Sequence, residues 1–197
     1  SNTDVVVHLA AWADVRASIE RPNEYWDNNV TTTTNVQKIC HKKEIQLLYA
    51  SSSCIHAWHK SPYGISKKVN EETAYPGQTG LRFTTVYGEG ARDTMMIGRL
   101  VRNEAKYATT HIRDFIHVED VMKVVRDYID GYRFSKQCNL VYPDRLKLSE
   151  WAKKFGATYE IINKKELDEP YISEKRNDLS QLEESIRYNN EKWSLFC

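Results

Sequence analysis

The sequence predicts an α/β fold with a doubly wound parallel sheet, and three observations support this prediction. Short apolar runs at 5–11, 45–50 and 80–88 alternate with longer amphipathic segments that suit helices. The first run is continuously apolar, as expected for a strand covered on both faces. Small or polar residues end each run, where doubly wound folds place their ligands. We therefore expect a binding site formed by the three strand ends, namely Leu9–Ala11, Ser51–Ser53 and Thr84–Val86.

Length, charge and composition restrict the classes of function. The chain has 197 residues, which suits one domain with a small appendage. Its 28 Lys and Arg residues nearly balance 27 Asp and Glu residues, which favours neither nucleic acid nor an anionic membrane as a partner. No apolar run approaches the roughly 20 residues that span a bilayer, and no signal peptide opens the chain. The four cysteines lack the spacing of metal ligands, so we expect a cytoplasmic protein without a metal site.

The segment from Ser51 to Lys67, SSSCIHAWHKSPYGISK, carries the clearest chemical signal. Ser61 followed by Pro62 favours a helix start, because the hydroxyl can accept from a free amide and proline fits the first helical position. Tyr63 and Lys67 stand four residues apart, so they share one face of that helix. An ammonium group beside a phenol lowers the pKa of the phenol, so the pair predicts a proton-transfer site. The alternative is a chance Tyr-x-x-x-Lys spacing on a solvated helix face.

Periodicity and bounding residues predict the remaining elements. A helix from Glu24 to about Lys42 should turn Trp26, Val30, Thr34 and Ile39 inward. A helix that begins near Val118 should bury one face, made of Val118, Val121, Met122, Val125, Tyr128, Ile129 and Tyr132. The other expected elements are helices from Tyr63 to near Ala74, from Arg92 to Glu104 and from Ser149 to Phe155, and strands at 80–88, 138–141 and 158–162.

Four motifs together resemble a known family. They are DVVVHLAA at 4–11, the three serines followed by PYGISK at 62–67, GLRFTTVYG at 80–88 and RDFIHVEDV at 113–121. The chain resembles the extended short-chain dehydrogenases/reductases that epimerise or dehydrate nucleotide sugars with NAD. This resemblance implies a partial Rossmann-like doubly wound parallel sheet with a small C-terminal α/β substrate-binding portion. Residues 1–90 with 114–135 would form an incomplete dinucleotide-binding domain, and residues 91–113 with 136–197 the substrate-binding portion.

The resemblance also implies residue roles. Tyr63 would be the catalytic base, Lys67 would lower its pKa and hold the nicotinamide ribose, and Ser53 would position the sugar hydroxyl. The implied NAD contacts are Leu9, Ala10, Ala11, Asn28, Ser51, Ser52, Tyr63 and Lys67, and the implied substrate contacts are Ser53, Thr85 and Arg113. A guanidinium group suits the diphosphate because it can donate two parallel hydrogen bonds. Thr85 as an ordinary strand residue and Arg113 as a surface partner of Asp114 remain alternatives.

The implied reaction is 4-epimerisation of a UDP-sugar through a keto-sugar. A second interpretation is a 3,5-epimerase or epimerase-reductase of a GDP-sugar, because Ser53-Cys54-Ile55 resembles the cysteine motif of those enzymes. A third is a catalytically silent chain that binds a nucleotide sugar or a protein partner, and a homodimer is one expected assembly. The glycine-rich phosphate-binding turn of the family, G-x-G-x-x-G, does not occur in the sequence. We therefore expect the chain alone to bind a dinucleotide poorly.

Overall fold

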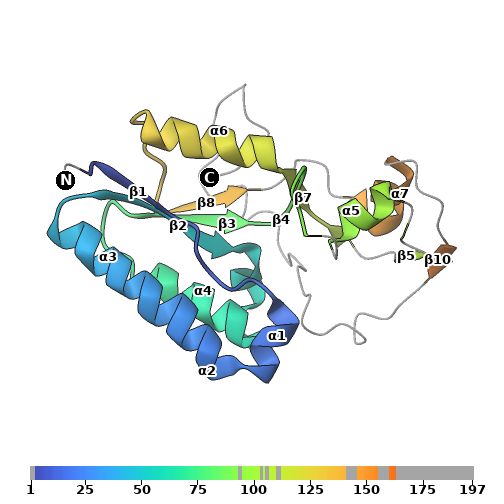
Figure 1. Cartoon of the computed structure of the whole chain (residues 1–197), viewed down its shortest axis with the longest axis horizontal. Helices are drawn as coiled ribbons and strands as arrows, with labels where there is room; N and C mark the ends of the chain where they lie inside the picture. The colour runs from blue at the N-terminus through green and yellow to red at the C-terminus, as the bar shows by residue number, and fades with distance from the viewer. Residues whose placement is uncertain are drawn as a thin grey trace.

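A computed structural model describes residues 3–92, 95–102, 104, 107–109, 112–140, 146–154 and 160–162. Four parallel strands in the order β1-β2-β3-β8 form the main sheet (Figure 1). These strands are β1 (Val5–His8), β2 (Gln46–Ser52), β3 (Thr79–Phe83) and β8 (Gln137–Leu140). The parallel sheet with flanking helices confirms the predicted fold class.

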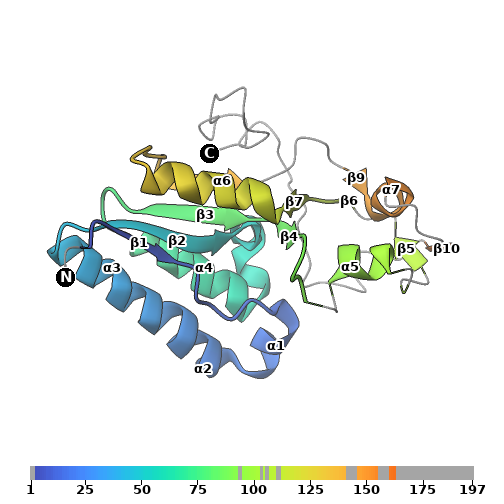
Figure 2. The ribbon, with the colours of Figure 1, turned by 45° about the horizontal axis from the view of Figure 1, so that its top comes forward.

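Helices cover both faces of the main sheet (Figures 1 and 2). On one face lie α3 (Thr32–Lys42) and α4 (Pro62–Glu72), and on the other lies α6 (Val118–Ile129). Successive side chains of β2 point to opposite faces of the sheet, as in any β-strand. Leu48 packs in the cluster that includes Val121 and Val125 of α6, whereas Leu47 and Tyr49 pack with Cys40 of α3.

The helical segments that precede β2 form one run from Pro22 to Lys42. It consists of α2 (Pro22–Tyr25), the π-helix η1 (Trp26–Thr31) and α3, and α1 (Val15–Glu20) comes before it. Trp26 and Ile39, expected to face inward, are instead 47% and 54% exposed. A π-helical turn is wider than an α-helical one, so extrapolating the α-helical period across η1 assigns these side chains to the wrong face. The buried residues of the run are Tyr25, Asn29, Val30, Thr33, Gln37 and Cys40.

The expected single strand at 80–88 is two strands, β3 and β4 (Thr85–Tyr87). Between them, the Thr84 hydroxyl donates to the Leu140 carbonyl oxygen at 2.8 Å. β4 then pairs in parallel with β7 (Phe115–His117), outside the main sheet. Thr84 is therefore the point at which the chain leaves one sheet for another.

A second group of short elements lies beyond β4 and β7 (Figure 1). Here β5 pairs with β10 and β6 with β9, and α5 and α7 lie near them. Their bounds are α5 (Met96–Val101), β5 (Tyr107–Thr109), β6 (Ile112–Arg113), β9 (Leu146–Lys147), α7 (Leu148–Lys154) and β10 (Glu160–Ile162). The remaining element, η2 (Ser53–Lys60), is a 3₁₀ segment between β2 and α4.

The strand expected at 138–141, which the sequence assigned to the substrate-binding portion, is β8 and pairs in parallel with β3 from Gly80 to Phe83 as part of the main sheet. On α6, Met122 and Ile129 are 49% and 53% exposed because helix packing covers a narrower stripe, formed by Val121, Val124, Val125 and Tyr128. Residues 163–197 of the expected substrate-binding portion lie outside the described residues.

Within the described ranges, no helix combines the length and apolar character that crossing a bilayer requires. In those same ranges, His, Cys, Asp and Glu side chains do not gather in any group of three that could hold a metal ion.

Candidate active site

A cavity of about 550 Å³ opens at the carboxyl ends of β1, β2 and β3. This volume lies within the range of small-molecule and cofactor pockets, and the position is where doubly wound sheets bind ligands. The structure brings most of the predicted site residues to its walls: Leu9, Ala11, Ser51, Ser52, Ser53, Tyr63, Lys67 and Thr85. Ala10 and Asn28 are not among the described residues that line it. Arg113 ends β6, and its side chain lies outside the described part of the structure.

Helix α4 presents Tyr63 and Lys67 to the cavity because its first turn is fixed by two serines. The Ser61 hydroxyl accepts from the Gly64 amide at 3.0 Å, with Pro62 at the first helical position, as predicted. The Ser18 hydroxyl of α1 accepts from the Tyr63 amide at 3.2 Å. Both amides would otherwise lack an intrahelical partner. The sequence analysis missed Ser18, which lies 45 positions away from its partner.

The Lys67 side chain crosses from α4 to the end of β2. Its ammonium group donates to the Ala50 carbonyl oxygen at 3.0 Å and lies 5.8 Å from the centroid of the Tyr63 ring. Only 2% of Lys67 is exposed, and burial lowers its pKa to about 8. The two side chains thus lie together at the cavity wall, as the four-residue spacing predicts.

The expected lowering of the Tyr63 pKa does not occur. Burial raises the pKa of the Tyr63 phenol above its ordinary value, and the nearby Cys54 thiol raises it further. A hydrogen bond with Ser52 and the charge of Arg92 lower it by less. Burial dominates because a phenolate loses its hydration in this wall, so the phenol is protonated at neutral pH.

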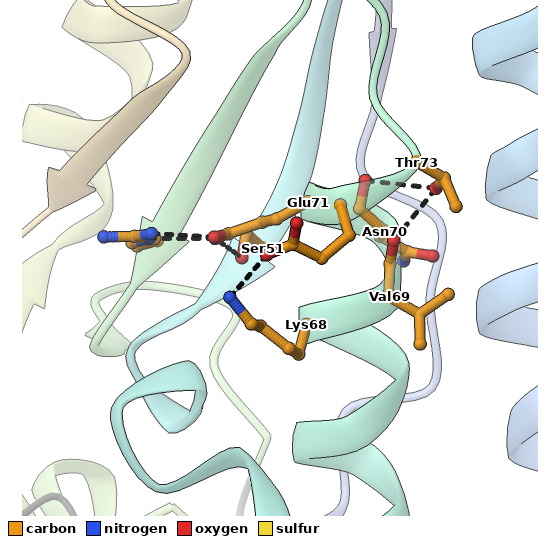
Figure 3. A network of polar contacts seen from close by, with 8 residues as sticks. Ser51, Lys68, Val69, Asn70, Glu71 and Thr73 are labelled. Carbon is orange, nitrogen blue, oxygen red and sulfur yellow. Dashed lines mark hydrogen bonds and ion pairs between the residues drawn. The ribbon is translucent and has the colours of Figure 1, made fainter.

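The three serines at the end of β2 have different surroundings. Ser52 accepts a hydrogen bond from the Cys54 amide at 3.1 Å and thereby begins η2. Ser53 is 7% exposed and lines the cavity together with Cys54. Ser51 donates to a carboxylate oxygen of Glu71 on α4 at 2.5 Å (Figure 3). Glu71 is bound on its other side by Arg82 of β3, and the sequence analysis identified neither residue.

Asn29, the neighbour of the predicted cofactor contact Asn28, is a buried asparagine near the site. Its side-chain oxygen accepts from the Trp12 amide at 2.8 Å, and its nitrogen donates to the Trp12 carbonyl at 2.9 Å and to the Ser66 hydroxyl at 3.3 Å. Asn28 is partly exposed and donates to the Asn29 side-chain oxygen. The polar side chain that needs partners is therefore one residue further along, where the π-helix turns it inward.

The outer part of the cavity is formed by the segment after β4. Gly88, Glu89, Gly90 and Arg92 line it, and Arg92 is exposed. Gly88 has a φ of 139°, and a β-carbon there would lie 2.6 Å from the Val118 side chain. The close approach of β4 to the start of α6 thus requires glycine at this position.

Comparison with protein families identifies the family of the chain. Residues 1–137 match the model of the NAD dependent epimerase/dehydratase family. The chain belongs to this family. The match spans the main-sheet strands β1, β2 and β3 and all the residues that the sequence predicted for the site, including Tyr63, Lys67 and Arg113.

Curated relatives have similar sequences over the same region. Protein CapI of Staphylococcus aureus is 34% identical over 151 residues, which cover 62% of this chain and 45% of CapI. The UDP-glucuronate 4-epimerase of Thermodesulfobacterium geofontis is 33% identical over 146 residues, covering 60% of this chain and 45% of that protein. UDP-glucuronate 4-epimerase 1 of Arabidopsis thaliana is 30% identical over 151 residues, which cover 60% of this chain and 35% of that protein. The chain thus matches less than half the length of these relatives.

Solved structures of similar fold include enzymes with bound nucleotide sugars. MoeE5 in complex with UDP-glucuronic acid and NAD superposes with a TM-score of 0.66 at 27% identity, covering 81% of this chain and 66% of MoeE5. A dTDP-4-dehydrorhamnose reductase from Yersinia enterocolitica gives a TM-score of 0.72 at 16% identity, covering 85% of this chain and 68% of the reductase. The second similarity shows the shared fold alone.

Proposed function

We propose that this family member acts in the NAD-dependent 4-epimerisation of a UDP-sugar, with UDP-glucuronate as the first substrate to test. The observation that carries the proposal is the placement of Tyr63, Lys67 and the serines 51–53 on one cavity at the carboxyl ends of the strands. The choice of sugar nucleotide rests on the names of the relatives and on the ligands of MoeE5.

The cavity residues fit the nicotinamide end of NAD. A lysine ammonium group has three N–H donors, and the Ala50 carbonyl takes one of those of Lys67, which leaves donors for ribose hydroxyls. Leu9 and Ala11 add a small apolar part of the lining at the end of β1. NAD held by these residues would supply reversible hydride acceptance at the sugar ring carbon.

Tyr63 moves the proton that accompanies the hydride. Removal of hydride from C4 requires that the C4 hydroxyl lose its proton, and return of hydride to the keto-sugar requires that the oxygen regain one. Because burial raises its pKa, the phenol is protonated at neutral pH and holds the proton that the second of these steps, donation to the carbonyl oxygen, requires. The positive charge of Lys67 beside the ring favours the phenolate that remains.

The substrate side of the site is assigned to Ser53 and Thr85, which both line the cavity. Ser53 would hold the reacting hydroxyl through a hydrogen bond from its own hydroxyl. Contact between Arg113 and the diphosphate stays a prediction from the family resemblance, and so does a homodimer.

Replacing the phenol tests the assignment. Tyr63→Phe should reduce conversion of UDP-glucuronate to its 4-epimer by about 100-fold or more, because positioned acid–base groups contribute factors of this size. NMR spectra of the sugar product, recorded at saturating NAD, measure the conversion, and calorimetry checks that the cofactor still binds. Tyr75→Phe is the matched control, since Tyr75 stacks on His41 and does not belong to the described lining of the cavity. Unchanged turnover in the Tyr63 variant would contradict the proposed role.

A second candidate function is 3,5-epimerisation of a GDP-sugar, because Cys54 lines the same cavity and its thiol acts on the Tyr63 pKa. The two reactions differ in their source of hydrogen. Returned hydride leaves the mass of the sugar unchanged in D₂O, whereas deprotonation at C3 or C5 incorporates solvent deuterium. Mass spectrometry of the product therefore distinguishes them, and Cys54→Ser should suppress deuterium uptake only in the second case. Binding of UDP-glucuronate without any turnover would instead favour a catalytically silent chain.

A further inference from the structure

Two neighbouring lysine–glutamate pairs on α4 have the same spacing but make different contacts. Lys67 precedes Glu71 by four residues, and Lys68 precedes Glu72 by four. Lysine and glutamate so spaced are neighbours on a helix surface and normally attract each other. The exposed pair forms an ion pair, with Lys68 Nζ at 2.5 Å from Glu72 Oε1. Within the described structure, no ion pair joins Lys67 to Glu71, and the Lys67 ammonium donates instead to Ala50.

Glu71 is held by residues of the sheet. Its two carboxylate oxygens accept from Arg82, at 2.9 Å from Nε and 2.7 Å from a terminal nitrogen, and the Ser51 hydroxyl donates to the first oxygen (Figure 3). Ser51 and Arg82 are direct partners in the register of β2 and β3. Glu71 is 2% exposed, so this fork-shaped contact is sheltered from water.

We propose that Arg82 is a positioning residue for the active site: by binding both oxygens of Glu71, it keeps this carboxylate away from Lys67 and leaves the Lys67 ammonium group at the cavity wall beside Tyr63. The inference rests on the proposed function for the role of Lys67. Arg82 itself does not belong to the described lining of the cavity, so it acts through Glu71.

The charges around Lys67 explain why the contact between Arg82 and Glu71 matters for the site. A buried charge without a partner costs free energy, so an unpaired buried carboxylate is expected to form an ion pair with a nearby cation. Without Arg82, Lys67 is available to Glu71 as a cation four residues away on the same helix face, whereas Lys68 is paired with Glu72. Pairing would draw the ammonium group toward Glu71 and away from Tyr63. Other titratable or charged groups near this wall are His8 of β1, which responds to the Lys67 charge, and Cys54, Tyr25 and Arg92, which act on Tyr63. Glu89 lines the outer part of the same cavity.

The pKa of Lys67 provides a direct test in the 197-residue chain. It is followed by pH titration of the Lys67 side-chain carbon resonances in ¹³C-labelled protein, assigned with Lys67→Met. In Arg82→Met the pKa should rise from about 8 to about 9 or above, because a carboxylate within ion-pair distance favours the charged form. Turnover of UDP-glucuronate should fall by about tenfold to hundredfold in kcat, with little change in KM.

The double variant Glu71→Gln/Arg82→Met separates this effect from general damage. With no carboxylate to capture Lys67, its pKa should return to that of the wild type and kcat should recover. Glu72→Gln, in the exposed pair, is the matched control and should change neither quantity. Arg82→Lys keeps the charge but loses the two parallel hydrogen bonds to Glu71, so it should raise the Lys67 pKa by a smaller amount. This variant provides the test if Arg82→Met does not fold.

Either of two results would overturn the inference. The first is a Lys67 pKa that stays at its wild-type value in folded Arg82→Met and in Arg82→Lys. The second is a pKa that stays raised in the double variant, since no carboxylate would then account for it. A shifted and restored pKa without turnover of any UDP-sugar would leave this inference intact and count against the proposed function instead.

Discussion

At the scale of single residues, Asn29 joins two segments that lie far apart in the sequence. Its side chain has no exposed surface and bonds Trp12 in the loop after β1 and Ser66 on α4. Residues of this loop and of this helix both line the cavity.

Replacing Asn29 should therefore cost stability. We expect Asn29→Ala to lower the free energy of unfolding by about 2–3 kcal/mol, because it removes the two hydrogen bonds of this buried side chain to the Trp12 backbone and its hydrogen bond to Ser66. Asn28→Ala, at the partly exposed neighbour, should cost less than about 1 kcal/mol. Urea unfolding followed by tryptophan fluorescence measures both. Equal losses in the two variants would show that Asn29 has no special structural role.

Lys67 should make stability depend on pH in the alkaline range. Its pKa is about 8 in the folded chain against 10.5 for an ordinary lysine, so between these values the unfolded chain binds a proton that the folded chain has released. Stability from this group therefore rises with pH over that interval. From pH 8 to pH 10, the wild type should gain about 2 kcal/mol relative to Lys67→Met. Parallel pH profiles of unfolding for the two proteins would contradict the lowered pKa.

Sequence spacing predicts residues whose partners are local and misses those whose partners are distant. Tyr63 and Lys67 were predictable because a helix places positions four apart on one face. Asn29 and Ser18 were not, since their partners on α4 lie 37 and 45 positions away. Arg82 was not predicted for the same reason. The sequence signal that points to it is the Lys67–Glu71 spacing, because that pair does not form the ion pair that Lys68 and Glu72 form at the same spacing.

At the scale of elements, α4 packs tightly on η2. A β-carbon at Gly64 would lie 2.7 Å from the carbonyl oxygen of Trp58 and 3.0 Å from its α-carbon. Backbone atoms cannot move aside as a flexible side chain can. The close packing thus depends on the absence of a side chain at this position.

Gly64→Ala should therefore destabilise the chain despite the better helix propensity of alanine. We expect a loss of about 1–3 kcal/mol from overpacking, measured by urea unfolding. Gly98→Ala in α5 is a suitable comparison, because there the nearest atoms belong to the flexible Arg102 side chain. That variant should be neutral or gain up to about 1 kcal/mol. A stabilised Gly64→Ala would mean that η2 shifts freely relative to α4.

The sequence also predicts element types better than the faces they bury. The helix expected from Glu24 to Lys42 exists, but η1 within it has no sequence signature, so Trp26 and Ile39 were assigned to the core and are exposed. Thr84 similarly divides an apolar run that reads as one strand, because its break depends on a hydrogen bond to Leu140, 56 positions away.

At the scale of the whole molecule, the described cavity offers residues for one half of the proposed dinucleotide. Lys67 and the strand ends are proposed to hold the nicotinamide end, whereas the sequence contains no G-x-G-x-x-G turn for the pyrophosphate. We expect the 197-residue chain to bind NAD weakly, with a Kd above about 1 mM. Isothermal titration calorimetry measures this, and nicotinamide mononucleotide should bind nearly as well as NAD. Micromolar binding of NAD would show that other residues hold the pyrophosphate.

The change of sheets at Thr84 divides the lining of the cavity into two parts. Before it lie the main-sheet strands β1, β2 and β3 and the helix α4, which carries Tyr63 and Lys67, while after it β4 pairs with β7 outside the main sheet. A single threonine thus joins the part of the chain that carries the proposed proton-transfer pair to the segment that forms the outer part of the cavity. Under the proposed function, substitutions after Thr84 can therefore alter the fit of the sugar without changing Tyr63 or Lys67.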